Sequence, residues 1–224
     1  MNPLSVLQDS LYFFRRHLLS IAKLCLPLII LETLLAQLLY TQLGSQPTTH
    51  AYIVLVGLVF YPLYSGALIL YLDARSQGEE PLKRDLLATS LRLWPSFALL
   101  VIICMLLIVA GFTLLVLPGI WIMVNLVFAE YLLVLRGLQP LAAIRQSLVL
   151  CKGHFWQILV CILGVMIPLW LIDALCQSLI GENPAPWLEL LLGCFSGFLT
   201  LFSTLVSFRL FMLVTDPTLE SEAS

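Results

Sequence analysis

The chain has 224 residues, of which 61% are hydrophobic and 11% are charged. An ordinary soluble domain has about 25% charged residues, so this composition excludes a typical water-soluble fold. A net charge of −2 gives no support for nucleic-acid binding, which needs clustered basic side chains. The apolar residues come in blocks of about 20, the length that crosses ~30 Å of hydrocarbon. The sequence therefore predicts an all-α integral membrane protein.

Six apolar blocks are long enough to be membrane spans, and their short connections leave no room for a separate soluble domain. In chain order, the predicted spans cover residues 18–40, 51–72, 97–117, 119–135, 155–180 and 187–214. The first follows Arg15, Arg16 and His17, but it is longer than the apolar part of a secretory signal and lacks a clear cleavage pattern. It is expected to stay in the protein as a span.

The third and fourth spans form one apolar stretch that is twice as long as a single helix needs. The only strong helix breaker in its middle is Leu117-Pro118-Gly119. Proline disrupts a helix interior and moves the residue before it out of the helical region. We expect a tight turn there, and the alternative is a kink after which the chain re-enters the membrane.

The eleven basic residues predict the orientation, because Lys and Arg are enriched on the cytoplasmic side. They lie before the first span, after the second and after the fourth, and two more lie inside spans near the same side. In chain order they are Arg15, Arg16, Lys23, Arg75, Lys83, Arg84, Arg92, Arg136, Arg145, Lys152 and Arg209. An even number of spans with both ends in the cytoplasm satisfies this distribution.

Three basic segments precede hairpins of two spans each, at residues 4–16, 82–94 and 138–152. Their polar and apolar residues separate onto two helix faces, most clearly in the first segment. Such helices lie in the headgroup plane. The pattern predicts three repeated units of one interfacial helix and one hairpin, and the alternative is that any cytoplasmic segment before a span collects Ser, Leu and Arg.

Five short motifs occur along the second to sixth spans and their connections. They are Gly66-Ala67-Leu68-Ile69-Leu70, Ser90-Leu91-Arg92-Leu93, Leu117-Pro118-Gly119-Ile120, Ser147-Leu148 and Phe208-Arg209-Leu210-Phe211-Met212-Leu213. Together they resemble the YciC family of bacterial inner-membrane proteins. The resemblance covers roughly residues 60–214, and the Pro-Gly-Ile turn is its most specific element. It implies an inner membrane of a Gram-negative bacterium and a family without an established activity, so it transfers no catalytic residues.

The sequence contains no motif typical of an enzyme, a cofactor site or a metal site. Charged residues inside the spans are better candidates for function, because ionisable groups at membrane depth are costly. Lys23, Glu130 and Arg209 lie toward the cytoplasmic side. We expect Glu130 to pair with Arg209, or second with Lys23, and the alternative is that Arg209 reaches the headgroups alone.

Three carboxylates lie toward the periplasmic side, at Glu32, Asp173 and Glu189. No basic residue lies on that side to neutralise them. If they face one cavity, they could bind a cation or relay protons. The alternative is that each reaches the water interface separately.

Gly193 and Gly197 form a GxxxG motif in the last predicted span. Small residues at this spacing let two helix backbones approach closely in a membrane. The motif indicates either packing within the bundle or the interface of a homodimer.

The leading functional hypothesis is a non-enzymatic inner-membrane protein that acts through membrane lipids or other envelope proteins. Basic segments next to the membrane motivate it, because anionic lipids attract surface Lys and Arg. The alternative is a small-solute transporter or channel that uses the periplasmic carboxylates.

The predicted orientation can be tested with topology reporters. A reporter fused after Arg75 or Arg145 should report the cytoplasm, and one fused near Pro47 or Asn183 should report the periplasm, because of the positive-inside distribution. A cytoplasmic signal at Asn183 would reject the six-span arrangement.

Overall fold

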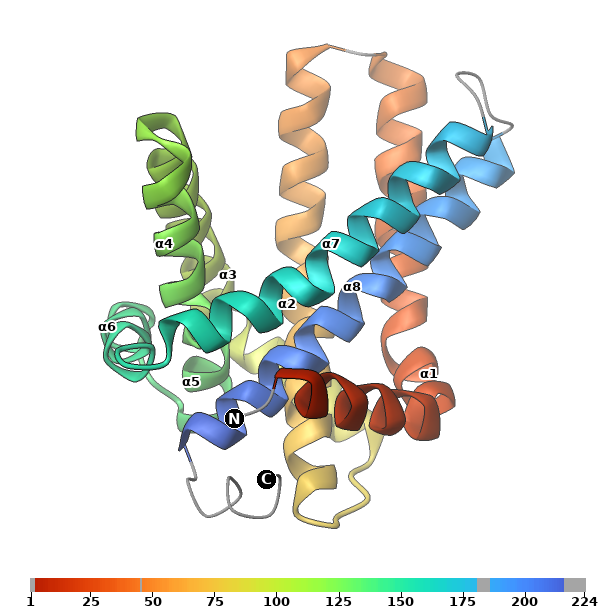
Figure 1. Ribbon diagram of the computed structural model, residues 1–224. Coiled ribbons are helices and arrows are strands. Elements are labelled where there is room, and N and C mark those ends of the chain that lie inside the picture. Colours follow the sequence, from red (N-terminus) through yellow and green to blue (C-terminus); the bar gives the residue numbers. More distant parts are fainter. Residues whose placement is uncertain (1–2, 45, 181–185, 216–224) are drawn as a thin grey trace.

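The computed structural model describes residues 3–44, 46–180 and 186–215, and these ranges contain helices and no strands. In chain order the helices are α1 (Pro3–Leu43), α2 (Pro47–Ser76), α3 (Lys83–Leu114), α4 (Val116–Leu126), α5 (Ala129–Arg136), α6 (Pro140–Leu150), α7 (Phe155–Ile180) and α8 (Pro186–Thr215). Figure 1 shows them as a bundle in which α1 begins and α8 ends at the same end.

Six segments are long and apolar enough to cross a membrane, as the sequence predicted. They cover Ser10–Leu43, Pro47–Ser76, Lys83–Leu114, Val116–Arg136, Phe155–Ser178 and Trp187–Thr215 within the described residues. The fourth consists of α4 and α5 together. The prediction of an all-α membrane protein is confirmed.

Proline and glycine set several helix ends. Pro47 and Pro140 occupy the first turns of α2 and α6, where a missing N–H leaves no hydrogen bond unmade. Gly137 follows α5 in the left-handed conformation with a φ of 62°, which glycine adopts without a steric penalty. These residues place α5 and α6 at an angle to each other.

The first and last membrane helices close the bundle, because α1 packs against both α2 and α8. α3 packs against α2 and α4, and α7 packs against α8. In Figure 1 the α3–α4 pair stands apart from the upper halves of the other helices. The α3–α4 pair is therefore attached to the bundle mainly at its lower end.

The turn between the third and fourth spans lies earlier than predicted. α3 ends at Leu114, Leu115 is extended with φ −167° and ψ 157°, and α4 begins at Val116. Pro118 lies in the first turn of α4, where its missing N–H is tolerated. The prediction of a turn at Leu117-Pro118-Gly119 is thus corrected to a turn at Leu115.

The three basic segments have different structures. The first is continuous with α1 in a single helix, which Figure 1 shows lying across the lower end of the bundle before it rises. The second is also continuous with its span, in α3, whereas the third forms the separate helix α6. The expectation of three separate helices is therefore corrected: only the third segment is a helix of its own, and the first two are the beginnings of α1 and α3.

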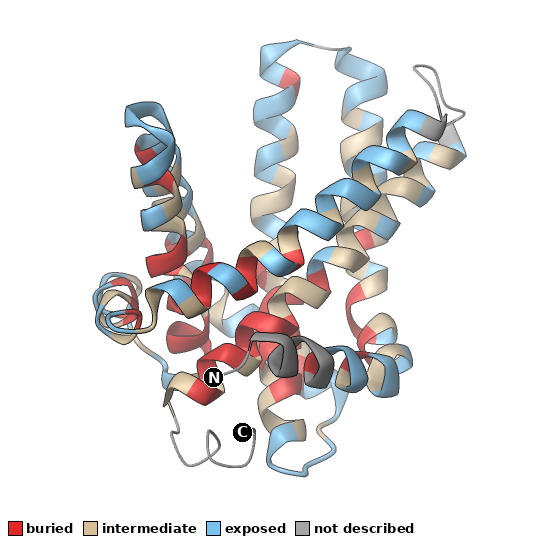
Figure 2. Cartoon of the chain, viewed as in Figure 1, coloured by how far each residue is buried: buried red, intermediate tan, exposed pale blue. Residues whose placement is uncertain are grey.

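The buried core lies at the end of the bundle where α1 begins and α8 ends, as Figure 2 shows. Its large, fully buried side chains include Phe97, Phe128, Leu68, Leu72 and Leu132. The upper halves of the helices expose apolar side chains instead. Such a surface suits lipid, which is as apolar as these side chains.

Candidate functional site

A cavity of about 420 Å³ lies between α1, α2, α3 and α5 and contains two carboxylates. Its polar side chains are Glu32 of α1, Tyr61 and Tyr64 of α2, and Glu130 of α5. The rest of its lining is Val54, Gly57, Leu58, Val101, Cys104, Met105, Ile108 and Val109. We call this the carboxylate cavity.

Tyr61 holds the Glu130 carboxylate at one side of the carboxylate cavity. The Tyr61 hydroxyl donates to the Glu130 carboxylate and lies 3.0 Å from both of its oxygens. Both side chains are partly buried. A hydrogen bond to a carboxylate is about twice as strong as one between neutral groups. This bond joins α2 to α5 inside the membrane region.

Glu32 lines the carboxylate cavity from α1. A Cβ atom added at Gly57 would lie 3.4 Å from Glu32 Oε1, an ordinary van der Waals distance, so the carboxylate lies beside the α2 backbone. Tyr64 of α2 also lines the cavity and is close enough to Glu32 to interact with it.

The carboxylate cavity opens toward the apolar exterior of the bundle. At its rim, Val54 is 46% exposed, Met105 is 46% exposed and Val109 is 50% exposed. Two carboxyl groups and two phenols can exchange protons, and their oxygens can bind a cation or accept hydrogen bonds from an ammonium group. The apolar lining can hold an aliphatic body. Its shape and lining are typical of small-molecule sites, which combine an apolar wall with a few polar groups.

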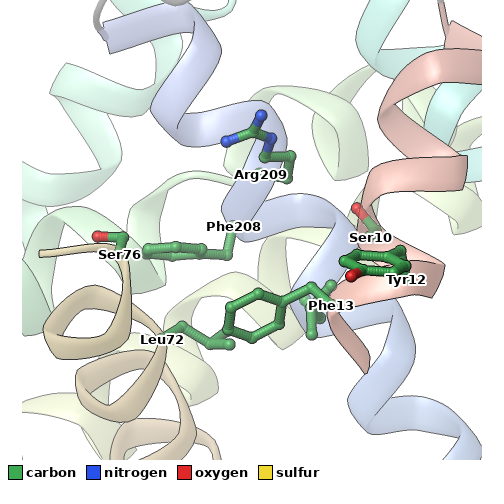
Figure 3. Close-up of a pocket in the computed structure, with 8 residues that line it drawn as sticks. Ser10, Tyr12, Phe13, Leu72, Ser76, Phe208 and Arg209 are labelled. Atoms are coloured by element: carbon green, nitrogen blue, oxygen red, sulfur yellow. The ribbon is translucent and has the colours of Figure 1, made fainter. Parts of the chain in front are cut away.

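Within the described residues, the structure shows no ion pair between Glu130 and either Arg209 or Lys23. Arg209 lines a different cavity, of about 390 Å³, with Ser10, Tyr12, Phe13, Leu72, Ser76, Leu205 and Phe208 (Figure 3). Lys23 is exposed. The predicted ion pair is therefore corrected to a hydrogen bond between Glu130 and Tyr61, because α5 presents Glu130 to α2 while Arg209 of α8 lies near the start of α1.

The three carboxylates that the sequence analysis expects toward the periplasm occupy three separate places. Glu32 lines the carboxylate cavity, whereas Asp173 accepts a hydrogen bond of 3.0 Å from Gln177 and lines a pocket between α7 and α8. Glu189 accepts one of 3.3 Å from Gln37 of α1. The hypothesis that Glu32, Asp173 and Glu189 share one cavity is therefore corrected. The second carboxylate in the cavity of Glu32 is Glu130.

The GxxxG glycines pack within the chain, against α1. A Cβ atom at Gly197 would lie 2.8 Å from Ile29 Cγ2, and one at Gly193 would lie 3.1 Å from Thr33 Cγ2. The two glycines thus bring α8 close to α1. This contact is the packing within the bundle that the motif indicated.

Sequence reasoning missed both tyrosines of the carboxylate cavity. Tyr61 and Tyr64 are three residues apart in a predicted span, so they share one helix face. Tyrosine hydroxyls usually find a partner when they are buried. The pair could have indicated polar partners for Glu32 and Glu130.

No group of three or more His, Cys, Asp or Glu side chains that could hold a metal ion occurs among the described residues. All six cysteines are free thiols.

Comparison of the chain with known proteins finds no matching family model, no matching curated protein and no matching solved structure.

The bond between Tyr61 and Glu130 can be tested by a double-mutant cycle. Tyr61→Phe should lower the free energy of unfolding by about 1–3 kcal/mol, because it leaves a partly buried carboxylate without its donor. In a Glu130→Met background the same change should cost much less. Denaturant unfolding in detergent measures both, with Tyr52→Phe on the exposed part of α2 as control. Additive losses, or coupling of Glu130 to Arg209→Met in the same assay, would contradict the assignment.

Proposed function

We propose that the chain is a non-enzymatic protein of a bacterial inner membrane, that both its ends are cytoplasmic, and that it acts by binding membrane lipids. The observation that carries this proposal is the first segment of α1, which presents two exposed arginines beside an anchored aromatic side chain. The resemblance to the YciC family agrees with the proposed location. The proposal also includes other envelope proteins as binding partners of the chain.

Phe14 anchors the first segment of α1 to α8. Its ring is buried, with centroid distances of 5.5 Å to both Phe198 and Phe202. The neighbouring Arg15 and Arg16 are exposed. Because the anchor fixes this part of the helix across the end of the bundle, the two guanidinium groups stay at one level of the membrane.

The exposed side of this segment combines charge with apolar surface. Leu11, Tyr12, Arg15 and Arg16 line an open hollow of about 590 Å³. Leu11 is 48% exposed and Tyr12 is 68% exposed. Aromatic and aliphatic side chains bind at the headgroup level, and arginine forms paired hydrogen bonds with phosphate. These features support binding of an anionic phospholipid headgroup at the hollow.

The lipid proposal predicts a charge-dependent preference for anionic lipid. In the full-length protein reconstituted into nanodiscs, Arg15→Gln and Arg16→Gln should each weaken the association with phosphatidylglycerol by about fivefold, since each surface arginine contributes ~1 kcal/mol. Spin-labelled phosphatidylglycerol would measure this association. The matched variants Arg15→Lys and Arg16→Lys should keep most of it, and an unchanged preference in the glutamine variants would refute the proposal.

The second candidate function is transport of a proton or small cation. The observation that favours it is the shared cavity of Glu32 and Glu130, since carboxylates at membrane depth are typical of ion and proton pathways. The four polar side chains come from three helices. A relative movement of those helices would change the surroundings of both carboxylates together.

Transport can be tested in proteoliposomes that contain the purified protein and a pH-sensitive dye. Under an imposed pH gradient or membrane potential, the unaltered chain should carry a proton or cation flux, and Glu32→Gln or Glu130→Gln should abolish it by removing a charge in the carboxylate cavity. Glu79→Gln, in the exposed connection after α2, is the control. Equal flux in all variants would exclude transport through this cavity.

A further inference from the structure

The tip of the α3–α4 hairpin exposes four consecutive large apolar side chains. Leu114 is 75% exposed, Leu115 is 70%, Val116 is 63% and Leu117 is 80%. No charged or amide side chain occurs between Arg92 and Asn125. A tip of this composition would present a large apolar surface if it were in water.

The sequences around the other two connections are polar. Thr41 and Gln42 lie in the last turn of α1, Gln46 precedes α2 and Thr48 lies in its first turn. The sequence between α7 and α8 includes Glu182 and Asn183. These side chains suit the water interface. The difference indicates that the α3–α4 tip lies in a different medium.

Both backbone polar groups of the one non-helical residue, Leu115, are bonded inside the chain. The Leu115 N–H donates to the Gly111 carbonyl at 3.1 Å, and the Leu115 carbonyl accepts from the Gly119 N–H at 3.3 Å. Pro118 has no N–H, and the Thr113 hydroxyl donates to the Ala110 carbonyl at 2.9 Å. In hydrocarbon each unsatisfied polar group costs several kcal/mol, so each of these bonds favours a turn inside the membrane.

Two glycines make this compact turn possible. A Cβ atom at Gly111 would lie 2.9 Å from the Gly119 Cα, and one at Gly119 would lie 2.6 Å from the Phe112 ring. The helix backbones therefore approach directly behind the tip. A single non-helical residue, Leu115, is enough to reverse the chain.

We propose that the α3–α4 hairpin is immersed in the bilayer and that its tip, Leu114 to Leu117, lies among the acyl chains of the leaflet opposite the basic connections. The partner of this surface is lipid hydrocarbon. The hairpin enters and leaves the membrane on the same side, so both chain ends stay on the side given by the basic residues. This inference is independent of headgroup binding at Arg15 and Arg16.

Cysteine labelling of the full-length protein in its membrane tests the proposal. A membrane-impermeant maleimide added from the side opposite the basic connections should label Gln46→Cys strongly and leave Leu115→Cys at the background of the unaltered chain. Both variants should label after denaturation. Because both positions are exposed, neither change disturbs packing. Labelling of Leu115→Cys as strong as that of Gln46→Cys would overturn the proposal.

A photocrosslinker distinguishes lipid from a protein that covers the tip. Benzoylphenylalanine at position 115 of the full-length chain, irradiated in the membrane, should yield phospholipid adducts in mass spectra of the purified protein. Adducts with a second copy of the chain or with another protein would show that the tip docks on protein, and would overturn immersion in lipid.

Discussion

Hydrocarbon offers no hydrogen-bond partners, and the rest of this structure depends on that constraint. Backbone groups inside the membrane must be satisfied within the chain, which favours continuous helices. Hydroxyls follow the same rule, since Thr33 donates to carbonyls of its own helix, Ile29 and Ile30. Where a polar group reaches another helix it ties the two together, as Trp94 does by donating to the Val59 carbonyl at 2.9 Å. Polar side chains therefore fix the helices that apolar packing alone would leave free to slide.

Close backbone approach provides the second means of fixing helices. Apolar side chains gain little by leaving lipid for protein, so helices associate where small residues allow tight contact. Gly193 and Gly197 serve this purpose between α8 and α1, and Gly111 and Gly119 serve it between α3 and α4. The first contact closes the bundle by bringing the first and last helices together. The second leaves the outer surface of its hairpin facing lipid.

Run length and charge distribution were sufficient to predict the class of fold and the number of membrane-length segments, because these depend on properties summed over many residues. Features that depend on which face of a helix a single side chain occupies were not predictable from the sequence. The turn at Leu115 lies among equally apolar neighbours, and Pro118 is tolerated just inside α4. Similar depth made Arg209 a reasonable partner for Glu130, but depth does not determine which helix face a side chain occupies. In the sequence, Tyr61 is one of the hydrophobic residues that define its span, and this classification ignores the hydroxyl that binds Glu130.

The position of the core determines how a molecule could reach the carboxylate cavity. Phe97 and Leu100 of α3 are fully buried in the core, whereas Met105, one and a half turns further on, is 46% exposed at the rim of the cavity. The cavity therefore lies where the packed end of the bundle gives way to helices surrounded by lipid. Few buried contacts would have to break at this rim, and local opening is easiest where such contacts are few. The rim thus offers an approach to Glu32 and Glu130 from the bilayer side that leaves the buried core intact.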